Sequence, residues 1–346
     1  MTAINRAAWI LSKGAAPAVG DADVPVPGAG ELVIENKAFP LHPGDWKVLK
    51  GIIPIELNYP TVIGNYAAGI VHSVGPQVTR FQPGDRVLSV TCYSLLNDHR
   101  YGAYQHFVLS SEAMTSIIPD SLAFPDATSA SQIYASMSAM VLHVGLDRPS
   151  ATPNPENKDK KVLIWGGGSS FGFFAVQIAV QAGYIVHTTA SPTSTSTLLS
   201  IGASSVHSYK SPTLLNDLLS HGPYHAIFAA QDTAADQLIM AQLLASQGGG
   251  SFISTMGPRP QAAGVTWPEG VTVQFVQYMD DYLKPENEEF KSWVFGEYIE
   301  GGLRDGKLKL GEVEVVGGLG SVGAALERLE AGGVRGRKLV IKANEE

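Results

Sequence analysis

The sequence predicts an α/β protein with a strand-rich first part and a doubly wound parallel sheet in the part that follows. Short runs of Val, Ile and aromatic residues, separated by Pro-Gly turns, fill residues 1–125. From Lys161 onward, short apolar runs alternate with segments of helical spacing, which is typical of a parallel sheet covered by helices. The chain has 346 residues, more than one hydrophobic core usually supports, so we expect two domains.

The first part is expected to form a compact β-barrel or a similar β unit, because its strands are short and its turns frequent. The expected strands are Glu31–Lys37, Thr61–Val74, Asp85–Val90 and Gly102–Leu109. An Ala-, Ser- and Met-rich stretch without proline then predicts one buried helix over Asp126–Leu146. The polar stretch 147–160 contains three prolines and predicts an exposed loop.

Strand and helix patterns alternate regularly after this loop. The expected strands are Val162–Trp165, Tyr184–Thr189, Ser205–Tyr209, His225–Ala229 and Gly250–Thr255. The expected helices between them are Phe173–Ala182, Thr195–Ile201, Leu214–Ser220 and Thr233–Ala245. Towards the end of the chain we expect an amphipathic helix, a strand, a helix and a strand, over Glu289–Leu303, Val313–Val316, Ser321–Ala331 and Lys338–Lys342.

Composition argues against several classes of protein. The formal net charge is −8, whereas sequence-independent binding of nucleic acid needs a basic surface. No run of about 18 apolar residues is present, so we expect no membrane span. A single cysteine, Cys92, excludes an internal disulfide framework and fits a reducing compartment, so a cytoplasmic location is expected. We interpret Cys92 as a small buried apolar residue.

The sharpest local signal is a glycine-rich segment between an expected strand and an expected helix. Its residues are Gly166, Gly167, Gly168, Ser169, Ser170, Phe171 and Gly172. Glycines permit a tight turn and let backbone N–H groups approach a phosphate, while the helix that follows presents its positive N-terminal end. Because strand–helix alternation continues afterwards, the segment predicts a dinucleotide-binding site; a plain glycine-rich turn is the alternative.

The end of the second expected strand bears on which dinucleotide binds. A site for NAD normally has Asp or Glu roughly 20 residues after the glycines, to bind the ribose 2′-hydroxyl. That position falls at residues 190–193, and no acidic residue occurs between Lys161 and Asn216. A carboxylate would repel a 2′-phosphate, so its absence favours NADPH, with Ser191 and Thr193 as hydrogen-bond donors and Lys210 as an added charge. The two hydroxyls also suit helix capping, and one residue can do both.

Several segments in the same order resemble the medium-chain dehydrogenase/reductase superfamily. They are Pro40–Lys47, which is similar to that family's Asn-Pro-x-Asp-x-Lys turn, then Val74–Val87, Trp165–Gly172 and the ending Gly336–Val340. The resemblance covers nearly the whole chain. It implies a GroES-like β-barrel catalytic domain over residues 1–125, to which residues 285–346 return, and a Rossmann NADPH-binding domain over residues 126–284.

Zinc alcohol dehydrogenases of this superfamily carry a Gly-His-Glu motif. Here the stretch begins Gly64-Asn65-Tyr66, so Asn65 replaces the metal-ligand histidine and Tyr66 replaces the acid. The turn 41–45, where another ligand would normally be a cysteine, has none. Since catalytic zinc needs about three N, S or O ligands, we expect no metal ligand and a zinc-independent member. It is most similar to fungal enoyl reductases, which often act in trans with polyketide synthases.

This resemblance implies roles for individual residues, each with a simpler alternative. Lys47 would lie near the nicotinamide ribose and stabilise charge on the substrate carbonyl, or it is a solvated surface lysine. Ser136 would touch the nicotinamide, or it packs a helix. Tyr66 would donate a proton, or it is a buried structural tyrosine. His42 would contact cofactor or substrate, or it only belongs to a turn. Tyr209 would lie near the adenine end of the cofactor, or it packs on its strand.

Gly257 completes the expected site, and two positions named above depart from the family. Gly257 follows the fifth strand of the expected sheet, which in this fold is the edge of the cleft. Relatives usually have Asp where this chain has Tyr66, and many have Lys where it has Thr193. The effect of these replacements on the chemistry is open.

The resulting prediction is an oxidoreductase that uses NADPH to reduce the activated C=C bond of an enoyl substrate, by hydride transfer to the β-carbon. The substrate would be a small molecule or be bound to a carrier protein, and a polyketide synthase is a possible partner. Reduction of a quinone, alkenal or small enone on the same scaffold is one alternative. A nucleotide-binding accessory protein with altered catalysis is another.

Overall fold

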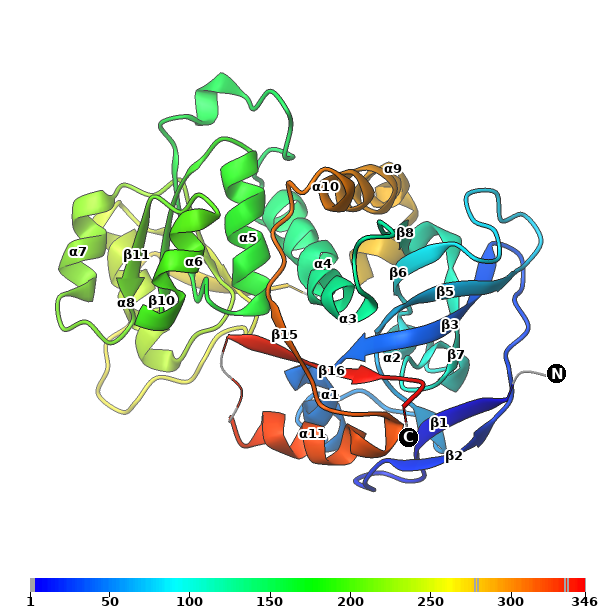
Figure 1. Cartoon of the computed structure of the whole chain (residues 1–346). Helices are drawn as coiled ribbons and strands as arrows, with labels where there is room; N and C mark the ends of the chain where they lie inside the picture. Colours follow the sequence, from blue (N-terminus) through cyan, green and yellow to red (C-terminus); the bar gives the residue numbers. More distant parts are fainter. Residues whose placement is uncertain (1–3, 277, 279, 333, 335, 346) are drawn as a thin grey trace. The chain divides into compact units, whose positions relative to one another are not determined.

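Two compact units make up the chain in this computed structural model, which describes residues 4–276, 278, 280–332, 334 and 336–345. The first unit combines Met1–Ser131 with Tyr282–Glu346, and the second is the continuous segment Gln132–Asp281 (Figure 1). Among the described residues, no helix is long and apolar enough to cross a membrane.

The first unit is built on two β-sheets. The larger sheet has the order β15-β16-β3-β5-β6-β8, and β7 also pairs with β3. Its strands are β3 (Glu31–Pro40), β5 (Tyr66–Val74), β6 (Arg86–Val90), β7 (Phe107–Ser111), β8 (Thr115–Ile117), β15 (Glu312–Val315) and β16 (Arg337–Lys342). The smaller sheet has the order β2-β1-β4, with β1 (Asn5–Ile10), β2 (Ala18–Ala22) and β4 (Thr61–Val62). Every pairing in these sheets is antiparallel except that of β15 with β16.

The expectation of a single strand over Thr61–Val74 was wrong, because this stretch forms β4 and β5 in different sheets. Gly64 lies between them with φ +101°, a conformation that favours glycine. A Cβ at Gly64 would lie 2.5 Å from the ring of Tyr104. The chain therefore turns here and passes close to Tyr104.

Short helices complete the first unit. They are α1 (Pro43–Leu49), α2 (Tyr93–Leu96), α3 (Phe124–Ala127), α9 (Glu288–Trp293), α10 (Glu300–Arg304) and α11 (Val322–Glu330). A π-helical segment, Val294–Ile299, links α9 to α10. Pro43 starts α1, where its missing N–H costs nothing, and Asp45 accepts a hydrogen bond from the His42 amide at 2.7 Å. The segment expected as a turn after His42 is thus a capped helix.

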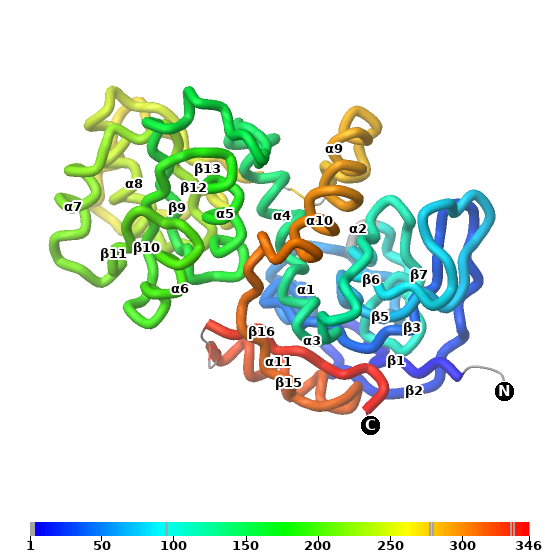
Figure 2. The backbone as a smooth tube through the Cα atoms, turned by 45° about the horizontal axis from the view of Figure 1, so that its top comes forward, coloured from blue at the N-terminus to red at the C-terminus, as the bar shows by residue number. Residues whose placement is uncertain are grey.

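The second unit contains a parallel six-stranded sheet in the order β11-β10-β9-β12-β13-β14. Figure 2 traces the backbone of this unit and labels β9 to β13. Its strands are β9 (Lys161–Trp165), β10 (Ile185–Ala190), β11 (Ser205–Ser208), β12 (Ala226–Ala229), β13 (Gly250–Ser254) and β14 (Val271–Phe275). Numbered along the chain within this unit, the order is 3-2-1-4-5-6, the arrangement of a Rossmann fold. The predicted fold class is confirmed.

Helices cover both faces of this sheet. They are α4 (Ile133–Met137), α5 (Ser170–Gln181), α6 (Thr195–Ser200), α7 (Leu214–His221) and α8 (Ala234–Ser246). On one face, α7 and α8 bury a core that includes Leu163, Leu218 and Met240. On the other face, Phe171 of α5 contacts Phe228 of β12, with ring centroids 5.4 Å apart, and α4 packs against α5.

The stretch predicted as one helix over Asp126–Leu146 is helical up to His143, but it is not one regular α-helix. The stretch consists of the end of α3, a 3₁₀ segment over Thr128–Gln132, then α4 and a π-helical segment over Ser138–His143. The Thr128 hydroxyl donates to the Pro125 carbonyl at 2.6 Å. Ser and Thr side chains that bond to nearby backbone in this way compete with regular helix formation.

Candidate functional site

The turn between β9 and α5 has no room for side chains at its glycines. Gly166 adopts φ +79°. A Cβ at Gly167 would lie 2.1 Å from Oγ1 of Thr188, and one at Gly172 would lie 2.3 Å from the Gly166 carbonyl oxygen. The backbone therefore passes close to the neighbouring strand and folds back onto itself, which forms the shallow backbone cradle that a pyrophosphate needs.

Ser169 fixes the start of α5. Its hydroxyl donates to the Gly166 carbonyl at 2.8 Å and accepts from the Gly172 amide at 3.0 Å. The amides of Ser170 and Phe171, in the first turn, have no intrahelical partner. They point along the helix axis with the positive end of the helix dipole, so the residues of this turn fit a dinucleotide phosphate.

The hydroxyl groups at the end of β10 lie next to the glycine turn. The Ser191 hydroxyl is 2.8 Å from that of Thr193 and 3.4 Å from that of Ser194. A Cβ at Gly168 would lie 3.0 Å from the Ser194 hydroxyl, so the glycine turn and this strand end adjoin. These short side chains leave the edge neutral and rich in hydrogen-bond donors, which suits a 2′-phosphate.

Tyr209 follows β11 at the same edge. Because Ala190 pairs with Ser208 in parallel register, Ser191 and Tyr209 stand at neighbouring positions. The Tyr209 side chain is exposed, and the ammonium of Lys210 lies 5.9 Å from its ring centre. The Tyr209 ring and the Lys210 ammonium thus lie at the edge where the adenine end of the cofactor is expected.

A buried ionic network holds the turn after β13. Asp232, whose side chain is fully buried, accepts from Arg259 Nε at 2.7 Å and from the Ser254 hydroxyl at 2.6 Å. The Gln237 amide donates to the Gly257 carbonyl at 2.8 Å. Gly257, a predicted cofactor residue, is therefore fixed by side chains that the sequence alone did not indicate, since they come from two separate stretches, 232–237 and 254–259.

Ser136 of α4 is fully buried and donates to the Phe171 carbonyl at 2.9 Å. This bond ties α4 to the first turn of α5. The Phe171 ring also meets the Tyr278 ring edge-on at 5.0 Å, and burial raises the pKa of Tyr278 to about 12. The observed contact of Ser136 is with the helix that carries the glycine turn.

In the first unit, α1 carries two predicted site residues. His42 is the N-cap, and Lys47 lies in the last turn, half-buried, with its ammonium 5.8 Å from the Trp46 ring centre. Asp45 is buried and accepts a hydrogen bond from the Tyr104 hydroxyl at 2.7 Å. A cation near a helix C-terminus is also favoured by the helix dipole.

A lysine from the last strand reaches this helix. Lys338 of β16 is 6% exposed; it donates to the Ser131 hydroxyl at 3.1 Å and lies 3.4 Å from Nε2 of His42. Burial lowers the pKa of Lys338 to about 7 and raises the pKa of Asp45 to about 6. The pKa of His42 is well below its usual value because of burial and the charge of Lys338. Lys338 and Asp45 therefore both have pKa values near neutral pH.

Tyr66, at the start of β5, is 5% exposed, and its ring centre lies 4.6 Å from that of His42. The structure thus brings Tyr66, His42 and Lys338 into one cluster. The sequence indicates the first two as site residues but not Lys338, although Lys338 lies in the segment Gly336–Val340 that resembles the family. In the part of the chain that the structure describes, one group of side chains can hold a metal ion, and it consists of His187, His207 and His221.

Comparisons with known proteins agree with this architecture. The model of the alcohol dehydrogenase GroES-like domain matches residues 28–120. The dehydrogenase azaJ of Aspergillus niger is 31% identical over 97% of this chain and 98% of its own. The trans-enoyl reductase himH of Aspergillus japonicus is 31% identical over 98% of this chain and 97% of its own. An alcohol dehydrogenase superfamily protein from Novosphingobium aromaticivorans has the same fold, with a TM-score of 0.78, 18% identity and coverage of 98% and 100%.

A GroES-like unit joined to a Rossmann unit with a glycine-rich turn defines a class of oxidoreductases that bind a nicotinamide cofactor. The similarity to azaJ and himH extends over nearly the full length of each chain. The chain belongs to the medium-chain dehydrogenase/reductase family.

Proposed function

We propose that this protein is an NADPH-dependent, zinc-independent enoyl reductase that acts on a biosynthetic intermediate of the polyketide type. The observation that carries the proposal is the end of β10, where hydroxyls and no carboxylate adjoin the glycine turn. The similarity to a trans-enoyl reductase along the whole chain supports the reaction.

The cofactor would be held mainly by the second unit. The proposed binding residues there are Ser136, Gly166, Gly167, Gly168, Ser169, Ser170, Phe171, Gly172, Ser191, Thr193, Tyr209 and Gly257. His42 and Lys47 would contribute from the first unit. When bound, NADPH supplies the hydride that the β-carbon of the enoyl group needs.

In this proposal, Lys47 stabilises the negative charge that develops on the substrate. Reduction of an enoyl thioester builds negative charge on the carbonyl oxygen, and a fixed cation there lowers the barrier. Tyr66 is the candidate for a proton donor to the α-carbon. Its ring lies against His42, in the cluster that also contains the ammonium of Lys338.

We further propose that the substrate reaches the enzyme as a small enoyl thioester or on a carrier protein, with a polyketide synthase as the partner. The name of himH describes an enoyl reductase that acts in trans, which supports a separately encoded partner. Carrier-bound substrates should therefore be tested beside free thioesters.

The test is a titration with NADPH and NADH, followed by NADPH oxidation assays with a panel of acceptors. The panel contains crotonyl and 2-methyl-enoyl thioesters, free and carrier-bound, with an alkenal and a quinone. We expect tighter binding of NADPH and turnover of thioesters. Turnover of the quinone alone would replace the proposal by quinone reduction, and NADPH binding without any turnover would favour an accessory role.

The role of Lys47 is tested by Lys47→Ala against Lys50→Ala. Lys50 caps the end of the same helix, but its side chain is exposed and pairs with Glu330 at 3.4 Å. We expect Lys47→Ala to lower kcat for a thioester by 10²-fold or more, on the scale of losing one charge-stabilising donor, with roughly unchanged stability. Equal activity of the two variants would remove Lys47 from the mechanism.

A further inference from the structure

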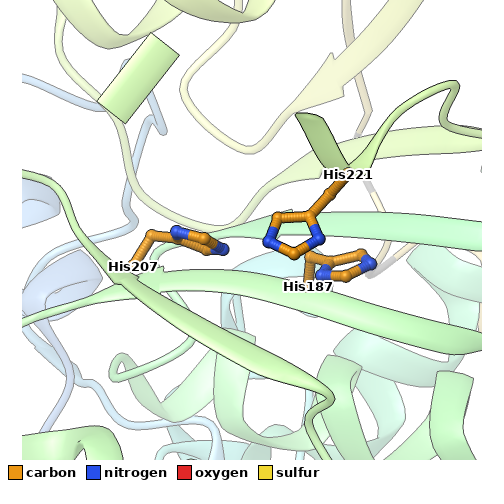
Figure 3. A group of neighbouring side chains, drawn as sticks. All are labelled: His187, His207 and His221. Carbon is orange, nitrogen blue, oxygen red and sulfur yellow. The ribbon is translucent and has the colours of Figure 1, made fainter. Parts of the chain in front are cut away.

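Three histidines of the second unit converge on the sheet face that α7 and α8 cover. His187 lies on β10, His207 on β11 and His221 at the end of α7 (Figure 3). His187 pairs in register with Leu163, which belongs to the core under α7 and α8, so His187 faces the same way. His207 is two residues after Ser205, the partner of His187, and shares that face.

The imidazoles are close enough to share a ligand. One nitrogen from each ring lies within 4.8 Å of the others. The His187 and His221 rings stack with centres 4.5 Å apart, and those of His207 and His221 are 5.1 Å apart. The Ser205 hydroxyl is 2.7 Å both from Nδ1 of His187 and from Nε2 of His207.

The other ring nitrogen of His187, Nε2, forms no hydrogen bond with the described residues. Nε2 of His187 is buried and has no hydrogen-bond partner among the described residues, and the residue as a whole is only 5% exposed. A buried polar atom without a hydrogen-bond partner is destabilising, and a bound ligand can supply the missing partner. His207 and His221 are half-buried, so the cluster is open to solvent on their side.

The surroundings favour the neutral form of the His187 and His207 rings, which is the form that binds a metal. Burial and the neighbouring His221 and His207 lower the pKa of His187 to about 4, and burial also lowers the pKa of His207. The charged groups that act on the two rings are Lys161, which opposes protonation of His187, and Asp217, which favours protonation of His207.

We propose that His187, His207 and His221 form a binding site for a divalent transition-metal ion of the Zn²⁺ type, separate from the cofactor site. Imidazole nitrogens bind Zn²⁺ at about 2.0–2.1 Å, so tetrahedral ligands stand roughly 3.3 Å apart. The present nitrogen spacing of up to 4.8 Å is wider than this, so binding requires the rings to move closer together. Three protein nitrogens leave a fourth position for water or the Ser205 hydroxyl.

Histidine-only ligation selects Zn²⁺, Co²⁺, Ni²⁺ or Cu²⁺ over Mg²⁺ and Ca²⁺, which prefer oxygen ligands. A bound ion would join β10, β11 and α7 and would stabilise the second unit. The proposal does not depend on the reductase activity, because none of the three histidines belongs to the proposed cofactor or catalytic residues.

The test uses full-length protein without a histidine tag, treated with chelator and desalted. Co²⁺ is added while the visible absorption is recorded, and Zn²⁺ is then added as competitor. The variants are His207→Gln and His221→Gln. His225→Gln is the control, since His225 is an exposed histidine of the same unit that stacks on Tyr184.

We expect one Co²⁺ per chain with tetrahedral absorption bands that Zn²⁺ removes. Each test variant should weaken binding at least tenfold, while the control keeps wild-type affinity. Zn²⁺ should also raise the melting temperature of the wild type and of the control, and not that of the test variants. Absence of binding below about 1 mM, or equal affinity in all variants, would overturn the proposal.

Discussion

Replacement of Gly172 by alanine tests the fit of the glycine turn to a phosphate. The added Cβ would lie 2.3 Å from the Gly166 carbonyl oxygen and 2.8 Å from the Gly167 Cα. Both are backbone atoms, and the Gly172 amide is tied to the Ser169 hydroxyl at 3.0 Å. The clash therefore cannot be relieved by a side-chain rotation, and the first turn of α5 must move away from β9 by about an ångström.

The expected loss of NADPH affinity follows from the hydrogen bonds between the amides of this turn and the phosphate. Charge-assisted bonds from backbone amides to a phosphate contribute roughly 1.5–3 kcal/mol each. Loss of one such bond weakens NADPH binding roughly 10- to 150-fold. Overpacking at Gly172 should in addition lower the free energy of unfolding by about 1–3 kcal/mol.

Fluorescence titration with NADPH and urea unfolding measure the two effects. The matched control is Gly323→Ala in α11, where the new Cβ meets nothing closer than 3.7 Å. Alanine in a helix interior is more stable than glycine by roughly 1 kcal/mol, so the control should bind NADPH normally and unfold at slightly higher urea. Wild-type affinity in Gly172→Ala would refute the assignment of the turn as the phosphate cradle.

Three further results are expected. Ser191→Asp should shift the preference from NADPH towards NADH, because a carboxylate repels the 2′-phosphate. Ser200→Asp, at an exposed position of α6, should not change the preference. Equal ratios of the Kd for NADPH to the Kd for NADH in the two variants would contradict this. Arg259→Leu should lower the free energy of unfolding in urea by about 3–5 kcal/mol, since it leaves the buried Asp232 carboxylate without its cation; a loss under about 1 kcal/mol would refute that role. In chelator, the free energy of unfolding should fall by up to about 3 kcal/mol as the pH drops from about 6.5 to about 4. The cause is the lowered pKa of His187, because the unfolded chain takes up a proton in this range and the folded chain does not. Urea unfolding of His187→Gln should therefore show a flatter pH profile.

Much of the second unit could be predicted because its signals are local. The apolar run before Gly166 and the helical spacing after it predict β9 and α5, and the polar loop before them marks where the alternation begins. The sixth strand, Val271–Phe275, was missed although Val271, Val273 and Phe275 alternate with polar residues; it is a largely exposed edge strand. The first two strands, Asn5–Ile10 and Ala18–Ala22, were also missed; Ala18–Ala22 has no buried residue.

The ionic and histidine clusters could not be predicted from spacing. Lys338 and Ser131 are 207 positions apart and meet only because β16 joins the sheet beside β3. The three histidines of the second unit come from two strands and a helix, and only the register of β10 against β11 brings two of them to one face. Such pairings depend on topology, which composition and periodicity do not contain.

The interleaved order of the two units bears on how the enzyme is made. The second unit is one continuous stretch, so on the ribosome it can fold as soon as Gln132–Asp281 has emerged. The first unit has to wait, because β15 and β16 follow that stretch and the edge of β3 that pairs with β16 at Ala38–Pro40 stays open until β16 arrives. During that interval the growing chain exposes an unpaired strand edge, which can pair with other chains. Lys338 arrives with β16, so the cluster around His42 is completed only after the whole second unit has been synthesised.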